Sequence, residues 1–316
     1  MKVSKNIVTL TLNPSIDHIL TVDTVSLYNK NILAGKQVFY GGKGLNAAFT
    51  LGKLGISATA AGLIGAQDLA GLDKKLSAVG IHNAFVPVNG ITRSAYKIME
   101  TATNRDTEFN QTGTWVSKKD LEKLKSTLKK LLNTHQWLTL CGSIPPGIPD
   151  GFYASQIEIS KQLGVITCLD TSSEPLKQGV RAAPDILRIN RFELGEILAR
   201  EITSTRETIS AIRTFQETGI GKVVVSMGAE GALGYDGENM LQVCVPQVEI
   251  RGLTGAGDAM TAGLIASFSQ GKSFADSLRF SSALATASTL KMEPGDFDHA
   301  NLEVVLRKTT VQEIAL

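Results

Sequence analysis

Short runs of apolar residues, rich in Val, Ile and Leu, recur along the chain with helical patterns between several of them. Each run has the length of a buried β-strand. The clearest runs cover residues 6–12, 136–141, 165–170, 186–189 and 222–226. Strands that alternate with helices are typical of βαβ units. The pattern therefore predicts an α/β fold with a mostly parallel central sheet and helices on both of its faces.

Two further segments have clear helical patterns. Ser117 begins an amphipathic helix with leucines on one face and lysines on the rest. The leucines are Leu121, Leu124, Leu128, Leu131 and Leu132, and the lysines are Lys118, Lys119, Lys123, Lys125, Lys129 and Lys130. We interpret the lysines as a solvated face. Residues 256–268 are apolar on nearly every side, so this helix is predicted to be buried.

Polar and apolar residues tend to alternate in residues 18–40 and 93–112, where turn residues are frequent. Alternation indicates strands with one wet face. These stretches are predicted to form a small antiparallel sheet apart from the main body, which could act as a lid. The sequence shows no fixed-period repeat and no Pro/Gly/Ser-rich linker, so one domain over residues 1–316 with a lid is expected.

The composition narrows the class of protein. The 316 residues are 43% hydrophobic and 20% charged with a net charge of +2, which argues against a disordered chain and a nucleic-acid binder. No apolar run approaches a membrane span and the N-terminus lacks a signal-peptide core, so a cytoplasmic protein is expected. Cys141, Cys168 and Cys244 lie far apart among apolar neighbours, without metal-ligand spacing. They are predicted to be reduced core residues.

A single carboxylate, Asp258, follows Gly255, Ala256 and Gly257 at the start of the predicted buried helix. The first N–H groups of a helix have no intrahelical acceptor and carry partial positive charge. Small residues leave those groups open to an oxyanion, so the segment is a candidate anion hole with an acid beside it. The alternative is that Asp258 caps the helix and the glycines turn the chain.

A second glycine-rich turn, "YGGKGLNAAFTLGKLG" at residues 40–55, also precedes a helix. It lacks the Walker A spacing and is not a GxGxxG fingerprint after a strand. Lys43 lies inside the predicted turn, where its charge could bind a phosphate or a sugar oxygen. The alternative is a flexible surface lysine.

Two more segments carry candidate ligands. In "RINRFELGEIL", residues 188–198, Asn190 and Glu193 lie three apart at the start of a helix, on one side of its first turn. Their oxygens suit Mg²⁺ through water, although the same spacing is also a capping box. The segment "VVVSMGAEGALGY", residues 223–235, reads as a strand, a glycine turn and a second strand. It could border a nucleotide or be an ordinary hairpin.

Together these segments resemble the ribokinase-like carbohydrate kinases, the PfkB family, over essentially the whole chain. "GGKGLNAA" with Gly55 and Gly65 is similar to the first family signature, "GAGDAMTAGL" to most of the second, and "NRFE" to the N-x-x-E motif. "TLNPSID", "GGKGLN" and "SIPPGIP" are most similar to the branch that phosphorylates sugar phosphates, which contains 1-phosphofructokinase and tagatose-6-phosphate kinase.

The resemblance implies a three-layer ribokinase-like sandwich with a β lid, MgATP as phosphoryl donor, and Asp258 as the base that deprotonates the acceptor hydroxyl. It also implies an anion hole formed by Gly255, Ala256 and Gly257, and a homodimer through the lid. The implied substrate contacts are Asp17, Lys30, Gly42, Lys43, Asn46 and Arg93. The implied nucleotide contacts are Arg188, Asn190, Ser226, Gly228, Ala229, Gly231 and Thr254, and Glu193 is the implied Mg²⁺ residue through water.

The sequence departs from the family at three places. Gly252 and Leu253 replace a polar residue and a Thr, Ser, Val or Pro, so a hydroxyl contact is lost unless Thr254 replaces it. Arg188 and Ile189 replace the Lys and Pro of the common "KPN", which leaves Arg188 as the phosphate contact. Glu108 and Phe109 lie where 6-phosphofructokinases of the family carry an Arg. The last departure argues against fructose 6-phosphate as acceptor.

Three functions are compatible with these residues. The first is phosphorylation of a ketohexose monophosphate, fructose 1-phosphate or tagatose 6-phosphate. The second is phosphorylation of a neutral sugar or nucleoside, and the third is a non-catalytic sugar-phosphate sensor on the same fold. A dinucleotide oxidoreductase is disfavoured because the glycines do not form its fingerprint. The expected partners are ATP and a small sugar phosphate, with no nucleic acid and no membrane.

Overall fold

The computed structural model describes residues 6–103, 105–215 and 217–314. Its main sheet has ten strands, which come from three parts of the chain: β1, then β4 and β5, then β8 to β14. In spatial order they are β14 (Thr310–Ile314), β13 (Met240–Cys244), β12 (Ala232–Tyr235), β11 (Lys222–Ser226), β10 (Ile186–Asn190), β9 (Ile166–Asp170), β8 (Trp137–Cys141), β1 (Ile7–Thr11), β4 (Thr59–Gly65) and β5 (His82–Val88). All neighbours from β11 to β5 pair in parallel, and β12, β13 and β14 add antiparallel strands at one edge.

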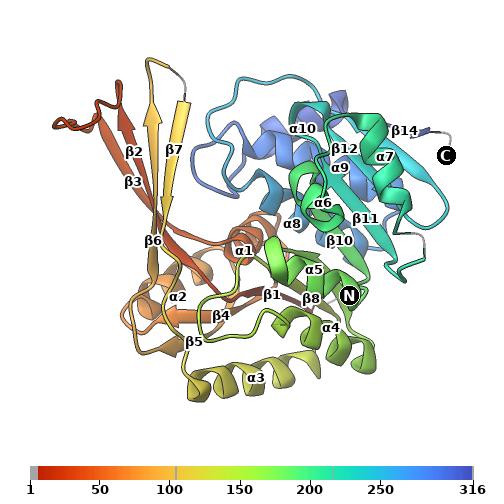
Figure 1. Ribbon diagram of the computed structural model, residues 1–316, viewed down its shortest axis with the longest axis horizontal. Helices are drawn as coiled ribbons and strands as arrows, with labels where there is room; N and C mark the ends of the chain where they lie inside the picture. The colour runs from red at the N-terminus through yellow and green to blue at the C-terminus, as the bar shows by residue number, and fades with distance from the viewer. Residues whose placement is uncertain (1–5, 104, 216, 315–316) are drawn as a thin grey trace.

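Helices cover both faces of this sheet (Figure 1). One face packs against α3 (Lys118–Leu132), α4 (Phe152–Leu163), α5 (Ser173–Arg181), α6 (Arg191–Leu198) and α7 (Thr205–Arg213). The other face packs against α1 (Lys43–Lys53), α2 (Leu69–Ala78), α8 (Ala256–Ser269) and α9 (Phe274–Ser288), and α10 (His299–Lys308) packs on α9. The predicted three-layer α/β sandwich is confirmed.

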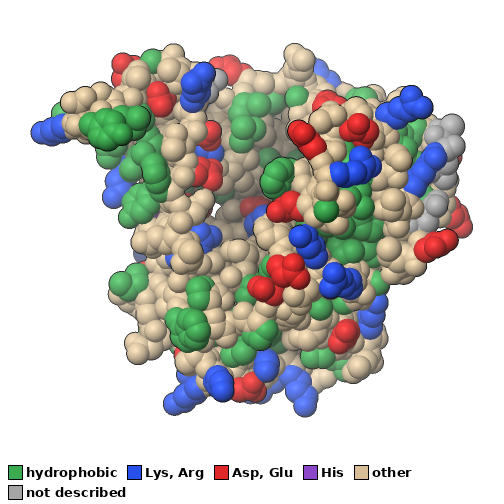
Figure 2. All heavy atoms as spheres, viewed as in Figure 1, with side chains coloured by type: hydrophobic (Ala, Val, Ile, Leu, Met, Phe, Trp, Pro, Cys, Tyr) green, Lys and Arg blue, Asp and Glu red, His purple; other side chains and the backbone are tan. Residues whose placement is uncertain are grey.

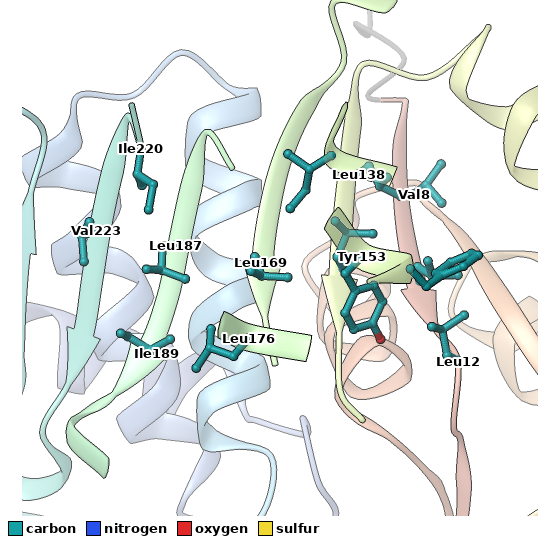
Figure 3. Close-up of a cluster of buried hydrophobic side chains, with 14 of the residues drawn as sticks. Val8, Leu12, Leu138, Tyr153, Leu169, Leu176, Leu187, Ile189, Ile220 and Val223 are labelled. Atoms are coloured by element: carbon teal, nitrogen blue, oxygen red, sulfur yellow. The ribbon is translucent and has the colours of Figure 1, made fainter. Parts of the chain in front are cut away.

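The core follows from the apolar runs that predict the strands. In register across the sheet, Leu169 lies beside Leu187 and Leu187 beside Val223, and their side chains leave the same face (Figure 3). All three are buried. Burial of each such side chain stabilises the fold by about 1.5–3 kcal/mol.

The predicted helices are present with small differences at their ends. Ser117 is the N-cap of α3, and its hydroxyl accepts a hydrogen bond from the Asp120 N–H. Leu121, Leu124, Leu128 and Leu132 are buried, whereas the predicted surface lysines are exposed. Helix α8 is buried along most of its length.

A separate four-stranded sheet stands out from the main body above α1 and α2 (Figure 1). Its strand order is β3 (Gly35–Gly41), β2 (Ser15–Val22), β6 (Arg93–Glu100) and β7 (Arg105–Asn110). The small sheet expected from the alternating pattern is therefore present. The expectation that it is antiparallel is wrong for one pair, because β2 and β6 run in parallel. They come from segments far apart in the chain, so no hairpin constrains their direction.

The prediction for the cysteines is wrong at one position. Cys141 and Cys168 are buried, but Cys244 is exposed. Cys244 is the last residue of β13, where β14 still pairs with the strand but β12 does not. Among the described residues, no helix is long and apolar enough to cross a membrane.

Candidate active site

The turn that leads into α8 separates two cavities. The first, with a volume of about 300 Å³, lies between this turn, α1 and the small sheet, and Thr254, Gly255 and Asp258 line it. The second, about 380 Å³, lies on the other side, and Leu253, Ala256 and Gly257 line it. We call the first the sheet-side cavity, because the small sheet lines it. We call the second the hairpin-side cavity, because the hairpin of β11 and β12 lines it. Figure 2 shows the surface hollowed between the small sheet and the C-terminal half of the chain.

The topology explains why polar groups meet here. Strands β9, β10 and β11 are parallel neighbours, and they end at Asp170, Asn190 and Ser226. The carboxyl ends of parallel strands meet at one edge of a sheet, which is where α/β proteins bind ligands. The N-terminus of α8 lies at the same edge, since Thr261 on its second turn donates a hydrogen bond to Asp170 at 2.6 Å.

Asp258 does not cap its helix. The N-cap of α8 is Gly255, whose φ of 84° is in the left-handed region that glycine tolerates, and no side chain caps the helix. Asp258 is buried, and its Oδ2 accepts a hydrogen bond of 2.7 Å from Asn46 Nδ2 on α1. The carboxylate therefore lines the sheet-side cavity, and the first amides of α8 are free of side-chain caps.

Burial, and after it the charge of Asp170, raise the pKa of Asp258 from 3.8 to a net value of about 6. Lys43, the Asn46 hydrogen bond and Arg188 act in the opposite direction. A carboxylate with a pKa near neutrality is suited to accept a proton. Asn46 offers a second acceptor for a ligand, because its buried Oδ1 has no hydrogen-bond partner among the described residues. A ligand hydroxyl could donate to that oxygen.

The pKa of Asp258 leads to a prediction about pH. If Asp258 accepts the acceptor's proton, kcat should rise with pH and level off above about 6, because the carboxylate must be ionised. Asn46→Ala removes a hydrogen bond that lowers this pKa, so the acid limb of the kcat profile should move to higher pH. A limb that stays in place would assign the titration to the substrate phosphate, whose second pKa is about 6.

The same shift predicts a gain in stability on removing the charge. The folded-state pKa of Asp258 lies above the unfolded value, so its ionisation costs stability as pH rises from 3.8 to about 6 and the full cost is present above that window. Asp258→Asn should therefore raise the free energy of unfolding at pH 8 by about 1–3 kcal/mol. Denaturant melts at pH 8 and pH 4 test this, because the gain should shrink at pH 4. An equal gain at both values would contradict the charge argument.

Lys43 is not a loop residue with a free charge. It is the first residue of α1, after the N-cap Gly42, and its Nζ lies 2.8 Å from Asp170 Oδ1 and 3.1 Å from Glu193 Oε1. Burial alone would lower the pKa of Lys43, but Asp170, Glu193 and Asp258 outweigh it and raise it. Lys43 thus links α1, β9 and α6 as a fixed cation at the wall of the sheet-side cavity.

Arg188 forms the second cation of this buried cluster. Its Nη1 lies 3.3 Å from Asp170 Oδ2 and its Nη2 donates to Ser226 Oγ at 2.9 Å. A Cβ on Gly257 would lie 2.6 Å from Arg188 Nη1, so only glycine lets the guanidinium approach the α8 amides this closely. Arg188 also lines the hairpin-side cavity, and its buried Nε has no partner among the described residues.

Asn190 and Glu193 form the capping box that the sequence left as an alternative. Asn190 Oδ1 accepts from the Glu193 N–H, and Glu193 Oε2 accepts from the Asn190 N–H, both at 2.8 Å. Glu193 Oε1 faces Lys43. Both carboxylate oxygens are thus engaged, although each has a lone pair left for a metal-bound water. Among the described residues, no cluster of three or more His, Cys, Asp or Glu could hold a metal directly.

The hairpin-side cavity is largely apolar. Ser226, Gly228, Ala229 and Gly231 line it from the β11–β12 connection, which is an antiparallel hairpin with a 3₁₀ turn at Gly228–Glu230. Val245, Val248, Ile250, Met260 and Ala285 are among its apolar residues. A flat apolar space beside helix N–H groups and an arginine can hold a base at one end and phosphates at the other.

The small sheet supplies the opposite wall of the sheet-side cavity. Asp17, with its neighbour Ser15, and Arg93 line it together with Gly42, Lys43 and Asn46. The Arg93 Nε donates to the Asn13 carbonyl at 3.2 Å and its Nη1 to the Gln111 carbonyl at 3.4 Å. The charge of Asp17 acts on the pKa of this guanidinium, but no ion pair among the described residues includes it. Burial raises the pKa of Asp17, against its Ser15 hydrogen bond and the charge of Arg93. Arg93 is therefore a cation available to an anionic ligand.

Lys30 is not part of either cavity. It lies in the exposed connection between β2 and β3, away from the cavity walls. Two other residues were missed from sequence. Asp170 could have been noticed, because it ends a buried strand at the ligand-binding edge of the sheet. Lys97 contacts Thr254 from the small sheet, and nothing in the alternating pattern singles it out.

Almost the whole fold matches one family of known proteins. Residues 10–300 match the pfkB family carbohydrate kinases, and the chain belongs to this family. It is a phosphotransferase that acts on an alcohol group, and ATP is the donor that such a kinase implies.

Named relatives agree with this class. The chain is 32% identical over 309 residues to the 1-phosphofructokinase of Rhodobacter capsulatus, covering 98% of both chains. It is 30% identical over 310 residues to the 1-phosphofructokinase of Escherichia coli K12, covering 98% of this chain and 99% of that one. Among solved structures, the phosphofructokinase-2 of Escherichia coli in complex with fructose-6-phosphate has a TM-score of 0.86 at 26% identity. That similarity covers 95% of this chain and 98% of the other.

Proposed function

We propose that this chain transfers the γ-phosphoryl group of MgATP to a hydroxyl of a ketohexose monophosphate, with fructose 1-phosphate or tagatose 6-phosphate as acceptor. One observation carries the proposal: the turn at residues 253–258 lies between the two cavities, with Asp258 on the sheet side and Ala256 and Gly257 on the hairpin side. An acceptor and a nucleotide bound in these cavities would meet at the turn.

The chemistry divides between the amides and the carboxylate of this turn. The oxygen of the acceptor hydroxyl forms a bond to the γ-phosphorus while the Asp258 carboxylate takes the proton of that hydroxyl. The bond from that phosphorus to the β,γ-bridging oxygen breaks, and ADP leaves with the electron pair. The amides at Gly255–Gly257 stabilise the negative charge of the transferring group. Positioning and electrostatic stabilisation supply most of the catalysis of phosphoryl transfer.

The buried charge cluster holds this machinery in place. Asp170 accepts hydrogen bonds from Lys43, Arg188 and Thr261, which come from α1, β10 and α8. The charges of Lys43 and Arg188 hold the pKa of Asp170 below its usual value despite complete burial. In the proposed complex, Arg188 contacts the phosphates of the nucleotide, and its orphan Nε is an additional donor toward them.

Magnesium fits this donor set only through water. Glu193 would hold the ion by a bound water beside Asn190, because its carboxylate oxygens already accept from Asn190 N–H and face Lys43. When bound, Mg²⁺ supplies positive charge that neutralises the nucleotide phosphates. Asn190 and Glu193 keep the start of α6 rigid at that position through the capping box.

One observation favours a phosphorylated acceptor over a neutral sugar or nucleoside, and a second argues against fructose 6-phosphate as that acceptor. Arg93 lies in the cavity wall without an ion-pair partner among the described residues, and its planar fork suits a phosphate. Glu108 lines the same cavity and pairs with Lys97, so this wall carries a carboxylate where 6-phosphofructokinases are expected to carry an arginine. We infer that the acceptor's phosphate lies toward Arg93 and away from Glu108.

A panel of acceptors tests the proposal. ADP release should be measured with MgATP and fructose 1-phosphate, tagatose 6-phosphate, fructose 6-phosphate, fructose, ribose or adenosine. The acceptors are compared by kcat/KM, because the ratio of these constants measures specificity. Fructose 1-phosphate or tagatose 6-phosphate should have the highest value. A higher kcat/KM for a neutral acceptor would move the function to the second hypothesis. No turnover with any acceptor, combined with sugar-phosphate binding, would indicate a sensor.

We also propose a homodimer through the outer face of the small sheet. His18, Val38, Tyr96 and Phe109 are neighbours across its four strands, and Val38 and Phe109 are about half exposed. A row of aromatic and apolar side chains on the surface of a sheet is a typical association site. A structural relative, the phosphofructokinase-2 of Escherichia coli, has a tetrameric inhibited form.

The assembly has its own test. Phe109→Asp should convert the dimer to a monomer, because it would place a charge in the row, whereas Phe192→Asp on exposed α6 should not. Light scattering after size-exclusion chromatography measures the mass. A monomeric parent protein would contradict the proposal.

A further inference from the structure

Lys97 joins the small sheet to the turn that carries the amides and the base. It lies on β6, and its Nζ donates to the Thr254 Oγ1 at 2.9 Å. Thr254 directly precedes Gly255, the N-cap of α8. Both residues line the sheet-side cavity together with Asp258. One hydrogen bond therefore spans from the small sheet to the edge of the proposed catalytic turn.

The side chain of Lys97 is held from three sides. Its Nζ lies 2.5 Å from Asp106 Oδ2 and 3.2 Å from Glu108 Oε1, both on β7. Glu108 is the direct cross-strand neighbour of Lys97, so the strand pairing brings it close. A lysine ammonium has three N–H donors, and these three oxygens can accept all of them. Only 13% of the Lys97 side chain is exposed, whereas the two carboxylates are about half exposed.

This arrangement makes Lys97 different from a substrate-binding cation. Arg93 forms no ion pair with a carboxylate in the part of the chain that the structure describes, but Lys97 is neutralised by two carboxylates and uses its third donor on Thr254. The hydroxyl of Thr254 accepts from the ammonium and keeps its own proton to donate. A hydroxyl that accepts from a cation becomes a stronger donor, so Thr254 is prepared to donate to an oxyanion at the turn.

We infer that Lys97 is a positioning residue: through Thr254 it ties the small sheet to the 254–258 turn, so that closure of the cavity and alignment of the amides and the base occur together. The inference rests on the proposed kinase function for its kinetic consequences. Its structural consequence is independent of that function: the turn loses order when the hydrogen bond between Lys97 and Thr254 is removed.

Two variants cut the tie in different ways. Lys97→Met removes the ammonium at nearly constant length. Thr254→Val removes only the hydroxyl and leaves the pairs of Lys97 with Asp106 and Glu108 intact. Lys36→Met is the matched control, because Lys36 is an exposed lysine on β3 of the same sheet.

The first measurement is hydrogen–deuterium exchange of the full-length protein with MgADP. Amides in the segments 251–258 and 105–110 should exchange roughly 10-fold faster in Lys97→Met. Thr254→Val should affect 251–258 alone, and Lys36→Met should affect neither. Unchanged exchange of 251–258 in both Lys97→Met and Thr254→Val would overturn the inference, whatever the enzyme does.

The second measurement is kinetic. Lys97→Met and Thr254→Val should each lower kcat roughly 10-fold with little change in acceptor KM, and the double variant should be no worse than the worse single one, because both remove one contact. Lys97→Arg should recover part of the rate. A Lys97→Met defect confined to the KM of sugar phosphates would make Lys97 a phosphate contact and overturn the positioning role. If the parent protein has no kinase activity but the variants still exchange faster, the proposed function is refuted and the structural role of Lys97 is supported.

Discussion

Asp258→Asn should lower kcat by roughly 100- to 10,000-fold, because general base catalysis contributes that much to a reaction. The substitution keeps the size of the side chain, and an amide oxygen can still accept from Asn46, so the geometry of the turn should persist. What is lost is the ability to take a proton. The amides of Gly255–Gly257 remain, which is why some residual rate is expected.

The measurement is steady-state ADP release with saturating MgATP and fructose 1-phosphate. Asp23→Asn is the matched control, since Asp23 is an exposed acid at the end of β2 and lies outside both cavities. It should retain the parent rate. An Asp258→Asn protein with more than about a tenth of the parent kcat would remove Asp258 from the role of base.

Arg93→Ala should raise KM for the sugar phosphate roughly 10- to 100-fold, since charge-assisted hydrogen bonds to a phosphate are among the strongest polar contacts. The effect should fall on KM more than on kcat, because the phosphate is remote from the reacting hydroxyl and its contact is made equally in the ground and transition states. For a neutral ketose the same variant should change KM by less than about 3-fold, since no charge is then paired.

Arg105→Ala is the control for that experiment, because Arg105 is an exposed arginine on β7 of the same sheet. Comparison of the two variants with both acceptors separates loss of a phosphate contact from damage to the sheet. An equal loss for phosphorylated and neutral acceptors would show that Arg93 supports the sheet through its hydrogen bond to the Asn13 carbonyl and does not bind the phosphate.

The strands and helices could be predicted because their signals are local. The apolar run at 222–226 becomes β11 with the same bounds, and the leucine spacing after Ser117 becomes α3. Pairing is not local. The sequence between β2 and β6 contains no signal that these two strands run in parallel. The exposure of Cys244 depends on its place at the end of β13, where, of the described strands, only β14 pairs with it.

The candidate site divides in the same way. Asp258 and its small neighbours could be recognised because a lone acid at the start of a buried helix is unusual. The partner of Lys43 could not, because Asp170 is 127 residues away and meets Lys43 only through the order of the strands. Lys97 and Lys36 occupy similar alternating stretches, yet only Lys97 reaches Thr254. Direction of the side chains, and not residue type, distinguishes them.

The central claim is that the turn at 253–258 has a nucleotide on one side and an acceptor on the other, with the base between them. Isothermal titration of the Asp258→Asn protein with MgATP, with and without saturating fructose 1-phosphate, tests it most directly. We predict that MgATP binds the variant within about 3-fold of its affinity for the parent protein in both titrations, and that fructose bisphosphate forms at least about 100-fold more slowly than with the parent. Competition between the two ligands for one site, or loss of MgATP binding when the acid is replaced, would contradict it.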